Sequence, residues 1–142
     1  MKPKNQKPGA RLRIVLEPGM ALGPGKIDLL ESIKETGSIS AAGKRMRMSY
    51  RRAWLLVDEL NGYFSGPLVE ASKGGADGGG AALTAFGKDV LERYRRMEAR
   101  TADAIKAELA ALRRLTTKTR RPEGSSSSRK RRARSGKSSS KE

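Results

Sequence analysis

The stretch that decides the fold is GSISAAGKRMRMSYRRAW, residues 37–54. Ser38 stands where an N-cap belongs, ahead of a short helix that the pattern predicts over 39–46. Ser49 is a second N-cap candidate, and behind it an amphipathic pattern predicts a longer helix over 50–63. A short helix, a tight turn and a helix that begins with polar and basic residues together predict a helix-turn-helix.

The charges of this stretch favour a contact with DNA. No acidic residue occurs from Thr36 through Val57. Basic side chains neutralise phosphates, and an arginine in the major groove can donate two hydrogen bonds to guanine. An ordinary helical pair with a charged outer face is the alternative, which the acid-free run disfavours. Five basic residues crowd the junction between the two predicted helices: Lys44, Arg45, Arg47, Arg51 and Arg52.

The flanking segments complete the predicted domain. Alternating charged and apolar residues predict a strand over 11–17, and apolar residues at helical spacing predict a helix over 26–36. Short strands over 68–71 and 81–83, joined by the glycine-rich segment 74–80, predict a hairpin that would be the wing of a winged helix. The expected fold is therefore mainly α with a small β-hairpin, a winged helix-turn-helix with a long C-terminal helix.

Two apolar stripes run along the predicted helices. Trp54 shares a stripe with Val57, so we expect the indole to lie in the core. A second stripe follows Thr84, which is expected to cap a helix over about 84–114, too long for a core this small to cover. The residues of that stripe are Phe86, Val90, Tyr94, Met97, Thr101, Ile105, Leu109 and Leu112.

Composition narrows the function. Among 142 residues, 31 are basic and 15 acidic, a formal net charge of +16, which is typical of a chain that binds a polyanion. His and Cys are absent, so Ser-His-Asp and Cys-His nucleophiles, zinc sites of these ligands and iron–sulfur clusters are excluded, and we expect neither an enzyme nor a cofactor. The longest strongly apolar run, 53–57, is far shorter than the roughly 20 residues of a membrane span.

The charge is concentrated at the C-terminus. Residues 113–142 contain 12 basic residues and two acids, a net charge of +10, and two runs of serine. A segment with so little to bury predicts a disordered basic tail over 116–142. Residues 1–10 are expected to form a flexible basic arm, which leaves 11–115 as the folded domain.

Two glycine-containing segments resemble nucleotide-binding motifs, but their residues do not match the spacing or the structural context that those motifs require. Residues 19–26 resemble a phosphate-binding loop but lack Gly at position 20 and Ser or Thr at position 27. The glycines of 74–80 do not open a helix after a strand, as a dinucleotide site requires. The adjacent acids Asp58 and Glu59 face different ways on a helix, so no carboxylate pair for acid–base catalysis is formed.

Three motifs carry a resemblance to a known family: GSISAAGK at 37–44, MSYRRAW at 48–54, and GGADGGGAALTAFG at 74–87. Over about residues 11–112 the chain resembles the N-terminal DNA-binding domain of ModE-type, molybdate-responsive transcription regulators, a relative of the LysR-type winged helix. The resemblance implies a dimer held by the long last helix, with the turn at 49–52 in the major groove. Regulators of this family continue into molybdate-binding domains, which are not expected here.

These observations predict a set of functional residues. The expected DNA contacts are Ser38, Ser40, Lys44, Arg47, Ser49, Tyr50, Arg51, Arg52, Lys73, Gly74 and Gly75. The expected dimerisation residues are Val90, Tyr94, Met97, Ile105, Leu109 and Leu112.

The predicted function is a homodimeric, sequence-specific regulator that binds double-stranded DNA in the bacterial cytoplasm, at the nucleoid, without a membrane partner. Two alternatives stay open. One is an architectural nucleoid protein dominated by the basic tail, and the other is a protein-interaction module that uses the long helix.

Overall fold

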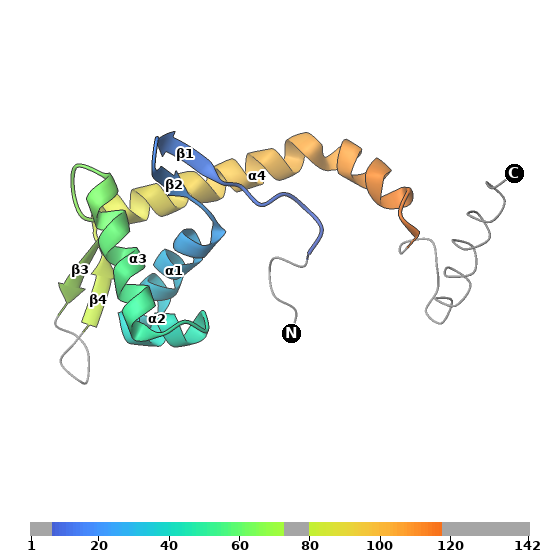
Figure 1. Ribbon diagram of the computed structural model, residues 1–142. Helices are drawn as coiled ribbons and strands as arrows, with labels where there is room; N and C mark the ends of the chain where they lie inside the picture. The colour runs from blue at the N-terminus through green and yellow to red at the C-terminus, as the bar shows by residue number, and fades with distance from the viewer. Residues whose placement is uncertain (1–6, 73–79, 118–142) are drawn as a thin grey trace, which may run out of the picture. The chain divides into compact units, whose positions relative to one another are not determined.

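The computed structural model describes residues 7–72 and 80–117. The chain divides into two compact units, Met1–Ala102 and Asp103–Glu142, and the last helix runs from the first unit into the second. The elements, labelled in Figure 1, are β1 (Ile14–Glu17), β2 (Met20–Leu22), α1 (Pro24–Thr36), α2 (Ile39–Arg45), α3 (Tyr50–Tyr63), β3 (Val69–Ser72), β4 (Gly80–Leu83) and α4 (Ala85–Arg114).

The helix boundaries follow from the caps that the sequence predicts. Gly37 ends α1 in the left-handed region at φ 74° and donates its N–H to the carbonyl of Ile33. Ser38 and Ser49 cap α2 and α3, and each hydroxyl accepts a hydrogen bond from a backbone N–H three residues later, at 3.0 and 3.1 Å. Thr84 caps α4 in the same way, because its Oγ1 accepts from the N–H of Gly87 at 2.9 Å.

Two antiparallel hairpins flank the helices. β3 pairs with β4 from Val69 opposite Leu83 to Ser72 opposite Gly80, as the predicted wing requires, although the segment that joins them lies outside the described residues. β1 pairs with β2, a strand that the sequence analysis missed. Gly19 takes φ 82°, which a Pro-Gly turn of type II requires, so Pro18 and Gly19 form the turn of this hairpin.

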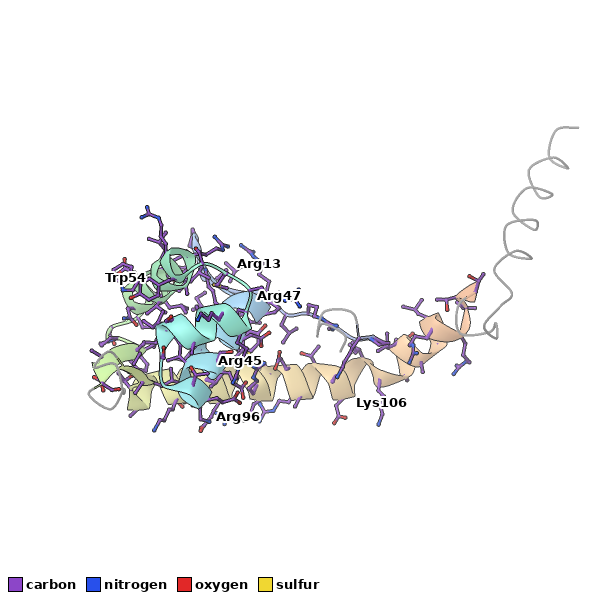
Figure 2. The ribbon with its side chains drawn as sticks, turned by 90° about the horizontal axis from the view of Figure 1, so that it is seen from below. Arg13, Arg45, Arg47, Trp54, Arg96 and Lys106 are labelled. Atoms are coloured by element: carbon purple, nitrogen blue, oxygen red, sulfur yellow. The ribbon has the colours of Figure 1, made fainter. Side chains whose placement is uncertain are left out.

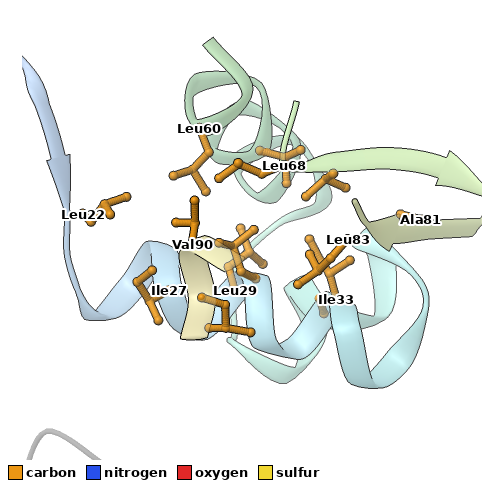
Figure 3. Packing of buried hydrophobic residues seen from close by; sticks show 14 of the residues in the cluster. Leu22, Ile27, Leu29, Ile33, Leu60, Leu68, Ala81, Leu83 and Val90 are labelled. Atoms are coloured by element: carbon orange, nitrogen blue, oxygen red, sulfur yellow. The ribbon is translucent and has the colours of Figure 1, made fainter. Parts of the chain in front are cut away.

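One hydrophobic core lies between α1, α3, the β3–β4 hairpin and the first half of α4 (Figure 3). The side chains of Ile27, Leu29, Leu30 and Ile33 on α1 are fully buried. Tyr94 of α4 is also fully buried, and its hydroxyl donates a hydrogen bond of 2.6 Å to the carbonyl of Leu12.

Trp54 is 46 % exposed, so the prediction that it lies in the core is wrong. The buried stripe of α3 is Ala53, Val57 and Leu60. A Cβ placed on Gly43 of α2 would lie 3.2 Å from the Cβ of Ala53, so the two helices approach closely enough that only a small side chain fits between them. Trp54 is one residue, about 100°, further around the helix and points away from this contact.

An ion-pair cluster joins α4 to α1. The guanidinium of Arg95 donates hydrogen bonds to Asp28 at 3.0 Å, to Glu98 at 2.9 Å and to Glu31. Burial lowers the pKa of Arg95, but the hydrogen bonds to the three carboxylates outweigh it and raise this pKa above its usual value. Arg95 therefore stays charged, and its cluster of ion pairs fixes the first half of α4 on α1.

None of the helices within 7–72 and 80–117 is both long enough and apolar enough to cross a bilayer.

Candidate nucleic-acid interface

The four residues between α2 and α3 form a tight turn. The N–H of Arg47 donates to the carbonyl of Lys44 at 3.0 Å, and the N–H of Met48 donates to the carbonyl of Gly43 at 2.9 Å. Together with the close contact between Gly43 and Ala53, these bonds hold the two helices in one arrangement. The α2–turn–α3 unit is therefore a rigid helix-turn-helix, packed on α1 and carried beside the β3–β4 hairpin (Figure 1).

Arg47 has an unusual backbone conformation. Within the described residues it is the one non-glycine residue with a positive φ, at 60°. For a residue with a Cβ the left-handed region costs roughly 1–2 kcal/mol relative to the right-handed one. The turn imposes this conformation, and it leaves the guanidinium of Arg47 exposed beside α2 and α3 (Figure 2).

The basic residues of the junction are all exposed. Arg45 forms an ion pair with Glu35. Within the described ranges no acid lies within ion-pair distance of the other four, Lys44, Arg47, Arg51 and Arg52. The helix-turn-helix therefore presents a cationic surface of four side chains that form no ion pair with this part of the chain. We call these four side chains the basic junction.

Glu59 makes its hydrogen bond and its ion pair with Tyr63 and Lys26, and the charge of Arg52 in the basic junction also acts on it. Its carboxylate accepts a hydrogen bond of 2.8 Å from the Tyr63 hydroxyl and pairs with Lys26 of α1 at 3.4 Å. The hydrogen bond from Tyr63 is the largest cause that holds the pKa of Glu59 below its usual value, and Lys26 adds to it. Glu59 thus closes a contact between α3 and α1, and Asp58 faces another direction, as predicted.

A hollow of about 520 Å³ lies between the start of α2, α3 and the β3–β4 hairpin. Its aromatic wall consists of Tyr50 and Trp54, which are 57 % and 46 % exposed. Asp58 and Glu70 contribute carboxylates to the same hollow. Periodicity alone places the indole next to Val57 on the buried side, so the sequence did not predict Trp54 as a surface residue.

The predicted DNA contacts fall into three groups. Ser38, Ser40 and Tyr50 line the hollow, and Ser49 with the basic junction lies at the end of α2, in the turn and at the start of α3. The hydroxyl oxygens of Ser38 and Ser49 are occupied as caps. The wing residues Lys73, Gly74 and Gly75 lie outside the described residues.

The predicted dimerisation residues divide along α4. Val90 and Tyr94 are buried in the core of this chain, so they are not available to a partner. No residue of α4 after Tyr94 is buried, and Leu112 is 62 % exposed. Met97 is partly buried against the core of this chain. The apolar residues of the stripe beyond it are Ile105 and Leu109, which are half-buried, and the exposed Leu112.

Comparisons with known proteins agree with this geometry. Over 96 residues the chain is 38 % identical to the molybdenum transport protein ModE of Azotobacter vinelandii. This match covers 68 % of this chain and 36 % of that protein. Over 83 residues the chain is 37 % identical to the DNA-binding transcriptional dual regulator ModE of Escherichia coli K12. This match covers 58 % of this chain and 32 % of that protein. The resemblance to ModE-type regulators is confirmed. No protein-family model matches the chain.

The chain spans about a third of the length of these relatives. Among solved structures, it is similar to the DNA-binding domain of CbnR in a crystal structure of its complex with DNA, with a TM-score of 0.50 and 25 % identity. That match covers 61 % of this chain and 94 % of the CbnR domain. The predicted winged helix-turn-helix fold is confirmed.

Proposed function

We propose that this chain binds duplex DNA through its helix-turn-helix and wing and regulates transcription in the bacterial cytoplasm. The observation that carries the proposal is the basic junction, four exposed cations that form no ion pair within the described residues, on a domain similar to those of DNA-binding regulators.

The N-terminal end of α3 is the part that reads the sequence. Arg51 and Arg52 extend from the first turn of α3, and an arginine there contacts O6 and N7 of guanine. Lys44 and Arg47 lie on α2 and in the turn, where they contact phosphates on either side of the groove. Phosphate contacts fix the position of the domain, and the base contacts supply the preference for one site.

A homodimer would carry two helix-turn-helix units, one from each copy of the chain. The end of the apolar stripe of α4, from Ile105 to Leu112, is the surface we assign to the second copy. Two copies related by a two-fold axis would bind a palindromic site with half-sites one or more helical turns apart. The basic residues beyond Leu115 add affinity for any duplex because each phosphate contact releases a counterion.

The test is selection of bound sequences from a random duplex pool with the full chain, followed by titration of the selected duplex and of a random duplex. We expect a palindromic consensus and an affinity at least about 10³-fold above that for random DNA. Equal affinity for both duplexes would favour an architectural nucleoid protein. The net charge of +10 on residues 113–142 is the feature of the sequence that supports this alternative. Absence of duplex binding at physiological salt would favour a protein-interaction module.

A further inference from the structure

The surface of α3 carries an apolar patch among its cations. Tyr50, Trp54 and Leu55 are 57 %, 46 % and 50 % exposed. Tyr50 and Trp54 are four residues apart and share a face, and Leu55 follows beside them. These three residues, the aromatic patch, also line a shallow depression together with Arg51. An exposed apolar surface ringed by charge marks an interaction site.

The surroundings of the aromatic patch define the occupant. Arg51 of the basic junction lines the same depression as the patch, so the partner is anionic overall. Asp58 and Glu70 line the hollow that Trp54 shares, and their carboxylates repel a phosphate from that position. The occupant therefore presents phosphates toward the basic junction and an uncharged, partly apolar edge toward Trp54.

The major groove of duplex DNA meets both conditions. An α-helix fits into this groove, and the one apolar group that the base pairs expose there is the 5-methyl group of thymine. The indole of Trp54 offers an exposed, flat apolar surface in the second turn of α3.

We propose that Trp54, with Tyr50 beside it, contacts a thymine 5-methyl group and makes this protein prefer thymine at that position of each half-site. This inference rests on the proposed binding of DNA through α3 and names the base that α3 reads. Arg51 and Arg52 read guanine independently, so each contact has its own position in the site.

The experiment uses the full chain and the duplex selected by it from a random pool, with each thymine replaced in turn by deoxyuridine, which lacks the methyl group. At one thymine in each half-site we expect the affinity to fall about fourfold, the equivalent of roughly 0.8 kcal/mol per buried methyl carbon. Trp54→Ala should bind the two duplexes equally well, whereas Trp54→Phe should keep part of the preference. Val15→Ala is the matched control, since Val15 is 57 % exposed on β1, and it should leave the fourfold effect unchanged.

A second readout does not depend on a variant. Trp54 is the only tryptophan of the chain, so its fluorescence reports on this position alone. Acrylamide should quench it in the free protein and much less in the complex with the selected duplex.

Two failures are distinguishable. If deoxyuridine is tolerated at every thymine while Arg51→Ala and Arg52→Ala still abolish the site preference, α3 reads DNA but the assignment to Trp54 is wrong. In that case, unchanged acrylamide quenching of Trp54 in the complex would show that DNA does not cover the aromatic patch, and an acidic protein would be the alternative partner for it. If the chain selects no sequence at all, the proposed function and this inference fall together.

Discussion

Gly87→Ala tests how α4 is seated on the domain. A Cβ at this position would lie 2.1 Å from the carbonyl oxygen of Leu68, whereas ordinary contact begins at 3.4 Å. Leu68 is fully buried, its N–H is bonded to Asn61 at 2.8 Å, and its carbonyl accepts the N–H of Thr84 at 2.9 Å. The 1.3 Å that are missing can be gained only by moving the start of α4 away from β3.

The expected change in stability is the sum of three effects. Overpacking of this kind costs about 1–3 kcal/mol, and loss of the hydrogen bond between Thr84 and Leu68 adds about 1 kcal/mol. Ala is a better helix former than Gly by about 1 kcal/mol, which offsets part of the loss. Gly87→Ala should therefore lower the free energy of unfolding by about 1–3 kcal/mol.

The matched control is Gly62→Ala, the same substitution in α3. No atom lies within 4 Å of a Cβ at Gly62, so only the helix preference remains and the variant should gain about 0.5–1 kcal/mol. Urea unfolding followed by circular dichroism should give midpoints that move in opposite directions at an unchanged slope. If Gly87→Ala were as stable as the original chain, or if both variants shifted the same way, the close approach of α4 to Leu68 would be refuted.

Three further variants test the interface. Arg51→Ala with Arg52→Ala should weaken binding to the selected duplex by about 1–3 kcal/mol per base-contacting residue and relax the consensus, measured by fluorescence anisotropy and repeated selection; retained preference would contradict the orientation of α3. Arg47→Gly should raise the unfolding free energy by about 1 kcal/mol, because glycine tolerates the positive φ, and should lower the salt dependence of DNA affinity by about 0.9 in the log–log slope. If Arg47→Gly were less stable than the original chain, contacts of the arginine side chain would outweigh the cost of its positive φ. Ile105→Glu with Leu109→Glu should yield monomers in sedimentation velocity at micromolar concentration, with unchanged circular dichroism; persistent dimers would place the second copy on another surface.

Local signals were sufficient for most of the fold. Ser38, Ser49 and Thr84 are short polar residues ahead of apolar periodicity, and each is an N-cap in the structure. Gly37 stops α1 by the left-handed conformation that glycine adopts without strain. Caps and stops act within one turn of helix, so a single sequence contains the information that places them.

Tertiary information was missing elsewhere. β2 is three residues long, too short for a period-two pattern, and it forms because the Pro18–Gly19 turn returns the chain along β1. Val90 and Tyr94 belong to the same apolar stripe as Ile105, and only the depth of the core determines where burial within this chain ends. Periodicity identifies an apolar stripe, but it does not say which part is covered by the same chain.

Trp54 shows how such an error can point to function. By hydrophobicity the indole belongs in the core, yet Ala53 occupies the buried position because Gly43 brings α2 within contact distance. The close packing that makes the helix-turn-helix rigid therefore forces the larger side chain outward, beside the basic junction. A sequence in which every residue served stability alone would place a polar residue at position 54. Violations of local rules are expected at functional sites, where stability is exchanged for binding. In this protein the exposed indole and the positive φ of Arg47 are two such violations, and both lie in the one surface that we assign to DNA.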